Sequence, residues 1–404
     1  MTLCVLASGC AASSASSPKT SGDGPLEPLP PLTVLASAEE SPGESSCEKS
    51  WDFWQRYSDA FIEGGRVIDR TDGARSTSEG QSYGMFFALV ANDRARFDAI
   101  LEWTEDNLAR GSLADHLPAW LWGRDDRGRW RVLDPNPASD ADLWIAYSLL
   151  EAGRLWSAPD YAELGRRVLD NAVAAEVRTL PGLGPMLLPA PDGFEIAEGR
   201  QWRLNPSYVP IFQLRRFEVE PDGADWSAIA NASVQMLQSV SPRGYAPDWV
   251  LYDSDRGFGV DPEHGARASY DAIRVYLWAG MTSPEDPNAD DVSNALWGPH
   301  AHFISEGRVE EVVDFRRPSI YSREGPPGFF AALMPGAKRR GDSAALQALR
   351  SRLDSYERGG LYGEPPAYYD QNLVMFANGF VEGRFRFAVD GTLLPKWSSS
   401  GCSL

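Results

Sequence analysis

The sequence predicts an all-α fold whose helices are arranged as an α/α barrel. Amphipathic stretches with apolar residues three and four positions apart recur along the chain, separated by loops rich in glycine and proline. Several stretches are apolar on more than one face, as expected of helices that other helices enclose. The loops are long and rich in aromatic residues, and no fixed-period repeat indicates a solenoid.

The clearest helical stretches lie between residues 53 and 353. We predict helices at Phe53–Phe61, Tyr83–Val90, Leu143–Leu155, Tyr161–Val173, Trp226–Leu237, Ile273–Met281 and Ser343–Leu353. Strand-like runs are few and short, for example Trp130–Leu133 and Phe385–Val389.

The start of the chain predicts an export signal. Residues 1–12 form a short apolar stretch in which a run of small residues, Ala7-Ser8-Gly9, is followed by Cys10. This pattern is similar to a bacterial lipoprotein processing site, where the cysteine becomes acylated. No basic residues precede the run, so a chance match stays an alternative to lipidation. We expect an exported protein, either periplasmic or anchored to the outer membrane as a lipoprotein through Cys10.

Residues 13–46 predict a disordered tether, because they are rich in serine, proline and alanine and show no apolar periodicity. Residues 47–404 predict a single folded domain, since closed barrels often exceed the usual domain size. Cys47 and Cys402 stand near the two ends of this domain. In an exported protein they could form a disulfide, and two free thiols are the equally open alternative.

The charge of the chain excludes polyanionic partners. Its 38 Lys and Arg face 57 Asp and Glu, which gives a net charge of −19, so nucleic acid and anionic membranes would be repelled. Of the four histidines only His300 and His302 are close in sequence, and no third metal ligand stands beside them. There is no glycine-rich phosphate loop and no Gly-x-Ser-x-Gly motif. We therefore expect no metal and no organic cofactor.

Acidic residues stand at three predicted helix starts. Glu79 lies in Ser76–Met85, where capping and the helix dipole would account for an acid, and where small and aromatic neighbours would also let a sugar ring approach. Asp140 and Asp142 open a second helix, and because they are two positions apart they should face different ways. Capping by Asp140 is the simpler alternative to a role in a cleft.

The third acid is Asp271, three residues before Arg274 on one helical face. A local ion pair between Asp271 and Arg274 would be enough to explain this spacing without a catalytic role. Helical barrels, however, gather the starts of their helices at one rim, which would bring the three acids together. Glycoside hydrolysis needs two carboxyl groups, one protonated to release the leaving group and one ionised to activate water or attack carbon. This chain can supply both.

Aromatic residues in loop-like contexts could bind sugar rings through their flat faces. Trp120 and Trp122 stand in a proline-flanked segment, and Trp202 and Tyr208 surround Asn205-Pro206-Ser207. Tryptophan is often part of a core, so for each of these residues a subsite and a core position are both open.

Three segments together resemble glycoside hydrolase family 8, and within it the periplasmic endoglucanases that accompany bacterial cellulose synthase. They are Ser78–Gly84, Ala138–Ala146 continuing to Leu150–Trp156, and Ser269–Tyr276, with a weaker echo at Tyr368–Asn372. The resemblance implies an (α/α)6 barrel of six inner and six outer helices, with an open cleft at one end and an inverting mechanism.

By the same resemblance, Glu79 would be the general acid, Asp271 the general base, and Asp140 the acid that positions the sugar at the cleavage subsite. Arg274, Tyr208 and the tryptophans would orient the base, the water or the glycan chain. Inversion requires room for water, so the two catalytic carboxyl groups should be roughly 6.5 to 9.5 Å apart.

The resemblance further implies that residues 47–404 form a catalytic domain with endo-β-1,4-glucanase activity on cellulose-type chains, functionally associated with a cellulose synthase complex. We expect a monomer whose partner is the β-1,4-glucan. One alternative is a hydrolase of the same fold acting on xylan, mixed-linkage glucan or chitosan. Another is a cellulose-binding accessory protein that does not cut, although the presence of all three acids disfavours it.

Overall fold

The computed structural model describes residues 51–197, 199–221, 224–318 and 322–398. The predictions for the signal segment 1–12, the tether 13–46 and a bond between Cys47 and Cys402 lie outside these residues and stay predictions, as does the single-domain boundary at residue 47. Within the described residues, no helix is long and apolar enough to cross a membrane.

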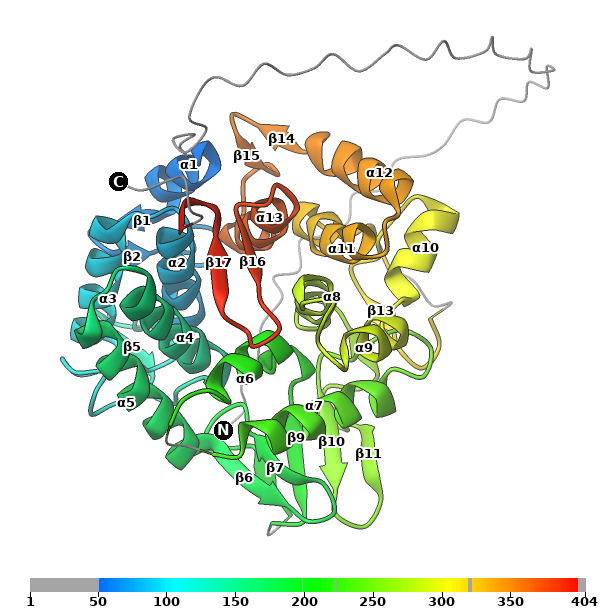
Figure 1. Cartoon of the computed structure of the whole chain (residues 1–404), viewed down its shortest axis with the longest axis horizontal. Coiled ribbons are helices and arrows are strands. Elements are labelled where there is room, and N and C mark those ends of the chain that lie inside the picture. The colour runs from blue at the N-terminus through cyan, green and yellow to red at the C-terminus, as the bar shows by residue number, and fades with distance from the viewer. Residues whose placement is uncertain (1–50, 198, 222–223, 319–321, 399–404) are drawn as a thin grey trace. The chain divides into compact units, whose positions relative to one another are not determined.

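The described helices form two concentric rings, as the predicted (α/α)6 barrel requires (Figure 1). The inner ring consists of α2 (Ser78–Val90), α4 (Ser139–Leu155), α6 (Ile211–Phe217), α8 (Ala272–Met281), α11 (Pro327–Arg339) and α13 (Tyr368–Val381). The outer ring consists of α1 (Asp52–Phe61), α3 (Arg94–Asn107), α5 (Pro159–Glu176), α7 (Trp226–Val240), α9 (Ala289–Ala295) with α10 (Gly298–Glu306), and α12 (Ser343–Asp354).

Burial separates the two rings. Every residue of α8 is buried, and in α2 every residue except Glu79 is buried. In the outer helix α3, by contrast, only one stripe is buried, made of Phe97, Ile100, Leu101 and Thr104. A helix enclosed on all sides has no polar face, and two such inner helices, α11, which contains Pro335, and α13, were not predicted from the sequence.

Short strands are more numerous than the sequence indicates, although none among the described residues is longer than the five residues of β5. They are β1 (Ile62–Glu63), β2 (Arg66–Val67), β3 (Ser76–Thr77), β4 (Leu121–Arg124), β5 (Trp130–Asp134), β6 (Val177–Leu180), β7 (Gly184–Leu187), β8 (Glu195–Ile196), β9 (Gln201–Leu204), β10 (Val250–Asp253), β11 (Gly257–Val260), β12 (Arg267–Ala268), β13 (Val313–Asp314), β14 (Glu357–Arg358), β15 (Leu361–Tyr362), β16 (Phe385–Phe387) and β17 (Leu393–Pro395).

These strands pair antiparallel and mostly precede or follow inner helices. The sheet β3-β4-β5 leads directly into α2, and the pair β12–β13 leads into the turn before α8. The largest sheet among the described residues has the order β11-β10-β9-β8. Its strand β9 ends at Leu204, just before a 3₁₀ turn at Pro206–Tyr208. The strands therefore fix where the inner helices begin.

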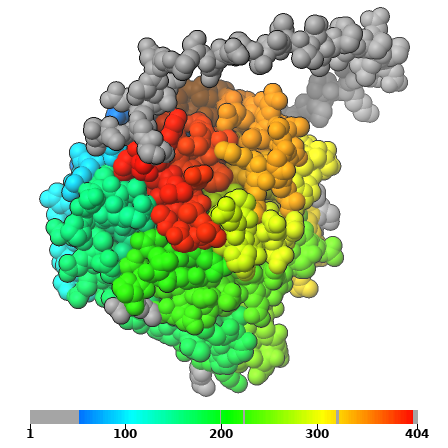
Figure 2. Space-filling view, in the orientation of Figure 1, coloured from blue at the N-terminus to red at the C-terminus, as the bar shows by residue number. Residues whose placement is uncertain are grey.

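The hairpin β16–β17 closes the barrel at the C-terminal ends of the inner helices. Phe387 stacks on Phe212 of α6 with ring centroids 3.9 Å apart. The Trp397 indole donates to the carbonyl of Leu89, at the end of α2. The backbone N–H of Leu393 donates to Glu151 of α4 over 2.9 Å. Figure 2 shows this segment, in red, over the middle of the face, so it covers this end of the barrel.

Candidate active site

The opposite rim is formed by the starts of the inner helices, and the three predicted acids meet there. Glu79 lies in the first turn of α2, Asp140 in the first turn of α4, and Asp271 directly precedes α8. The hydroxyl of Thr77 caps α2 by accepting from the N–H of Gly80, so Glu79 is not needed as the cap. The N-cap residue of α4, Ala138, makes no side-chain bond, and Asp140 accepts from the first-turn N–H of Ala141 over 2.8 Å, so its carboxylate serves the helix start as well as the site.

Arg274 of α8 joins the three acids. Its Nη1 donates to Glu79 and, over 3.1 Å, to Asp140, while its Nη2 donates to Asp271 over 2.8 Å. The same two nitrogens also reach the hydroxyls of Tyr83 and Ser207. The ion pair between Asp271 and Arg274 that their spacing predicts is therefore present, and it is one part of a larger buried network.

The acids differ in how far they are exposed. The side chains of Glu79 and Asp271 are 20% and 26% exposed, whereas those of Asp140 and Arg274 are 5% and 3% exposed. Glu79 and Asp271 also bind different nitrogens of the guanidinium group, so Arg274 separates them. A bound chain could thus reach two separate carboxyl groups, with Asp140 beneath them.

Burial raises the pKa of Glu79 to about 7. Arg274 and the hydroxyl of Tyr368, which donates to Glu79 over 3.4 Å, lower that pKa, while the charges of Asp140 and Asp271 raise it. Near neutral pH a large fraction of Glu79 therefore keeps its proton, as a general acid must. Burial also raises the pKa of Asp140.

Asp142 faces away from this network, as its spacing from Asp140 predicts. Its carboxyl group meets that of Glu176 at the end of α5, and both side chains are fully buried. Among the described residues their oxygens have no hydrogen-bond partner except each other. Burial raises the pKa of both groups well above the usual range, so the pair retains a proton that the two can share.

The predicted aromatic residues fall into two groups. The ring of Tyr208 lies 5.5 Å from the guanidinium carbon of Arg274, and the carbonyl of Trp120 accepts from the N–H of Ser78 beside Glu79. Trp202 is only 4% exposed and packs on Tyr252.

Trp122 lies in a separate aromatic stack. Its ring is 4.8 Å from that of Trp130, and the guanidinium group of Arg66 covers both rings. The structure therefore places Tyr208 and Trp120 at the acids and gives Trp202 and Trp122 other packing partners. Whether any of them binds sugar stays a prediction.

Tyr83 and Ser207, which contact Arg274, were not among the predicted site residues, and neither were Tyr368 and Asp248. Tyr368 opens α13 and donates to Glu79, and the short motif Tyr368–Asn372 was its only sequence signal. Asp248 accepts from the backbone N–H groups of Ser269 and Ala272, which flank Asp271. It stands in the segment Pro247-Asp248-Trp249. Trp249 itself stacks on Phe194 and His264 and lies 6.2 Å from Tyr208.

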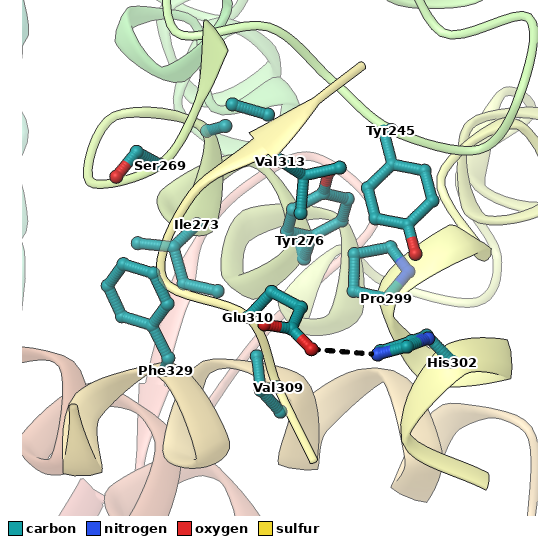
Figure 3. A pocket seen from close by; sticks show the side chains of 12 residues that line it. Tyr245, Ser269, Ile273, Tyr276, Pro299, His302, Val309, Glu310, Val313 and Phe329 are labelled. Atoms are coloured by element: carbon teal, nitrogen blue, oxygen red, sulfur yellow. Dashed lines mark hydrogen bonds and ion pairs between the residues drawn. The ribbon is translucent and has the colours of Figure 1, made fainter. Parts of the chain in front are cut away.

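A small cavity lies on the other side of α8, between that helix, α10 and β13 (Figure 3). Its volume of about 30 Å³ has room for roughly two water molecules, which is too little for a sugar ring. Glu310 and His302 meet across it over 3.3 Å. His300 instead donates from Nε2 to the carbonyl of Leu333 over 2.8 Å and stacks on Trp297. No group of three metal-binding side chains gathers among the described residues.

Comparison with known proteins agrees with this geometry. The model of glycosyl hydrolases family 8 matches residues 35–380. An endoglucanase of Xanthomonas axonopodis pv. citri is 46% identical over 92% of this chain and 96% of its own length. An endoglucanase of Escherichia coli K12 is 44% identical over 86% of this chain and 92% of its own length.

Among solved structures, the endo-1,4-D-glucanase of Vibrio fischeri superposes with a TM-score of 0.78 at 37% identity, covering 86% of this chain and all of that one. The family model spans far more than half of the chain, and the relatives align over nearly their whole length. The chain therefore belongs to glycosyl hydrolases family 8.

Proposed function

We propose that the protein is an endo-β-1,4-glucanase that cleaves cellulose-type chains with inversion of the anomeric configuration. One observation carries the proposal: Arg274 holds Glu79 and Asp271 on different nitrogens, with both carboxyl groups partly exposed. The endoglucanase names of its relatives, at 39–46% identity, support a glucan as the substrate.

In the proposed reaction Glu79 donates its proton to the glycosidic oxygen as the bond to the anomeric carbon breaks. Asp271 takes a proton from a water molecule, which attacks the opposite face of that carbon. Because burial raises the pKa of Glu79 to about 7, a large fraction of this acid is protonated near neutral pH before the substrate binds. Asp140, held beneath by Arg274, positions the sugar at the cleavage point.

The test is release of reducing ends from soluble carboxymethyl cellulose by the wild type, Glu79→Gln and Asp271→Asn. Each amide variant should lose about 10²- to 10⁴-fold in kcat, because proton transfer typically contributes that much. Anomer detection on a cello-oligosaccharide should show the α-anomer first. Activity that survives in both variants would refute these roles. If the wild type cuts only xylan, mixed-linkage glucan or chitosan, the proposed substrate is wrong and that glycan replaces it. If the wild type binds cellulose without cutting any glycan, the protein is an accessory protein and not a hydrolase.

We also propose that the protein is exported, as a periplasmic protein or as an outer-membrane lipoprotein acylated at Cys10, and that it works with a cellulose synthase complex as a monomer. The small residues before Cys10 support the first part. Labelling with a radioactive fatty acid should mark the wild type and leave Cys10→Ala unmarked. Equal labelling of the two would exclude acylation at Cys10.

A further inference from the structure

The turn Ser269–Ala272 carries Asp271 into the site, and a second buried carboxylate, Asp248, binds this turn. One oxygen of Asp248 accepts from the N–H of Ser269 over 2.7 Å and from the N–H of Ala272 over 2.9 Å. These two residues stand on either side of Asp271 in the sequence. Asp248 is only 5% exposed, and this oxygen is turned to the backbone of the turn.

Asp271 occupies the N-cap position of α8, yet its side chain makes no capping hydrogen bond. An aspartate at this position normally turns its carboxylate back onto the first N–H groups of its own helix, which have no partner within the helix. Here the N–H groups of Ile273 and Arg274, which such a carboxylate would take, donate to the carbonyls of Ser269 and Asp271. The Asp271 carboxylate binds Arg274 instead, and Asp248 accepts from the N–H of Ala272, the first residue of the helix. The Asp271 carboxylate is therefore left for the site.

Close packing does not fix this turn on every side. Ser269, Ala272 and Ile273 line the cavity of about 30 Å³ beside α8, where Figure 3 shows Ser269 and Ile273 at its edge. Hydrogen bonds must hold the turn there. The Ser269 hydroxyl donates to the Glu311 carbonyl over 2.7 Å, and Asp248 supplies the two bonds on the backbone.

The charges around Asp248 fit this role. Burial, and after it the charge of Asp271, raise the pKa of Asp248 to about 7, while the two N–H groups and Arg267 lower it. Arg267 pairs with its second oxygen over 3.3 Å, and Tyr276 of α8 also faces it. Asp248 is thus an electrostatic neighbour of Asp271 as well as the anchor of its backbone.

We propose that Asp248 is a positioning residue for glycan hydrolysis: by holding the N–H groups of Ser269 and Ala272, it fixes the turn that carries the Asp271 carboxylate toward the water that it activates. This inference rests on the proposed role of Asp271 as the general base.

The test compares kcat and KM of wild type, Asp248→Ala and Asp248→Asn on the glycan that the wild type cuts. Asp248→Ala should lower kcat by about tenfold to hundredfold, as misplacement of a catalytic group by about 1 Å can do, with KM within about twofold. Asp248→Asn keeps an oxygen acceptor for both N–H groups, so its kcat should stay within about threefold of wild type. A kcat of Asp248→Ala equal to that of wild type would overturn the proposal.

A double-variant comparison separates positioning from a general structural effect. In the Asp271→Asn background the base is already lost, so adding Asp248→Ala should lower kcat by less than about twofold, since residues that act as a unit are not additive. A further loss as large as in the wild-type background would show that Asp248 acts independently of Asp271. If Asp248→Ala does not fold, Asp248→Ser, whose side chain is too short to reach both N–H groups, replaces it in the same comparison.

Asp286 provides the matched control. It lies just beyond the opposite end of α8, its side chain is 1% exposed, it accepts from the N–H of Asn288 over 2.8 Å, and it pairs with Arg215. Asp286→Ala should lower the midpoint of urea unfolding and leave kcat unchanged. Failure of Asp271→Asn to lower kcat would refute the assignment of the base, whereas failure of Asp248→Ala alone would refute only its positioning role.

Discussion

The pH dependence of kcat/KM should follow the pKa of Glu79. The general-acid role proposed for Glu79 requires its protonated form, so kcat/KM should fall as the pH rises through the pKa of Glu79, which burial raises to about 7. The hydroxyl of Tyr368 stabilises the ionised form of Glu79 by donating to it. Tyr368→Phe removes this donor and should raise the pKa of Glu79, which moves the alkaline limb of the kcat/KM profile to higher pH by up to about one pH unit.

Tyr252→Phe is the control for that variant, because the Tyr252 hydroxyl donates to the Pro181 carbonyl and has no contact with Glu79. Its alkaline limb should coincide with that of wild type. If the alkaline limb of Tyr368→Phe stays in place or moves to lower pH, the Tyr368 hydroxyl does not lower the pKa of Glu79, and this explanation is wrong.

Residues that lie in helix-start motifs could be found from the sequence, and those that act from a distance could not. Glu79, Asp140, Asp271 and Arg274 were all predicted, and the structure brings them into one network. Tyr368 reaches Glu79 across 289 positions of the chain, and no local pattern encodes such a contact. The tryptophans were ambiguous for a related reason, since a flat ring suits a core and a sugar equally well.

The helices α4 and α5 meet at a buried pair of carboxyl groups, Asp142 and Glu176, which makes their packing sensitive to pH. Burial raises the pKa of both groups in the folded protein, whereas in the unfolded chain both ionise near their ordinary values. Folding therefore becomes less favourable as the pH rises above about 4 toward the folded-state pKa values. This loss is absent at lower pH, where both groups are protonated in either state.

Glu176→Gln removes one of the two ionisable groups and supplies an N–H donor to Asp142. We expect the variant to be more stable than wild type at pH 7 by about 1 kcal/mol or more, with the difference vanishing below about pH 4. Thermal unfolding followed across pH measures this. Glu163→Gln, on the exposed face of the same helix, should change the midpoint little at any pH. A Glu176→Gln variant that is less stable than wild type at pH 7 would show that the pair stabilises the contact as a charged unit.

Apolar periodicity predicted the existence of helices better than their boundaries. The periodic stretches at Tyr83 and Leu143 are real, but α2 and α4 begin earlier, at Ser78 and Ser139. Their first turns carry the polar groups of the site, so they do not continue the apolar pattern. The helix α13 was not predicted because almost all of its side chains are enclosed, and α11 contains Pro335, which normally ends a helix.

At the level of the whole barrel, the hairpin β16–β17 ties the last described residues to three inner helices. Phe387 is 4% exposed and contacts the aromatic rings of Phe86, Tyr147 and Phe212. Phe387→Ala should lower the free energy of unfolding by about 3–5 kcal/mol, the usual cost of emptying such a site. The midpoint of urea unfolding measures it, and kcat at low urea should remain that of wild type, because the network around Arg274, which we propose is catalytic, lies at the other end of the helices.

Val389 belongs to the loop of the same hairpin and is 42% exposed, so Val389→Ala should leave the unfolding midpoint nearly unchanged. A Phe387→Ala variant with the stability of wild type would mean that the hairpin only covers the barrel. The sequence predicted a strand at Phe385–Val389, but nothing in it indicated that this strand closes a ring, because closure depends on contacts with helices made hundreds of residues earlier.

That closure has a consequence for the order of events during protein synthesis. The ribosome makes residues 385–398 after all six inner helices, so the ends of α2, α4 and α6 stay uncovered while the rest of the barrel can already assemble. Until the hairpin emerges, aromatic rings such as Phe86 and Phe212 are open to contact with other nascent chains, and exposed apolar surface of this kind favours aggregation. The barrel is therefore completed only after residues 385–398 have been made, later than all six of its inner helices.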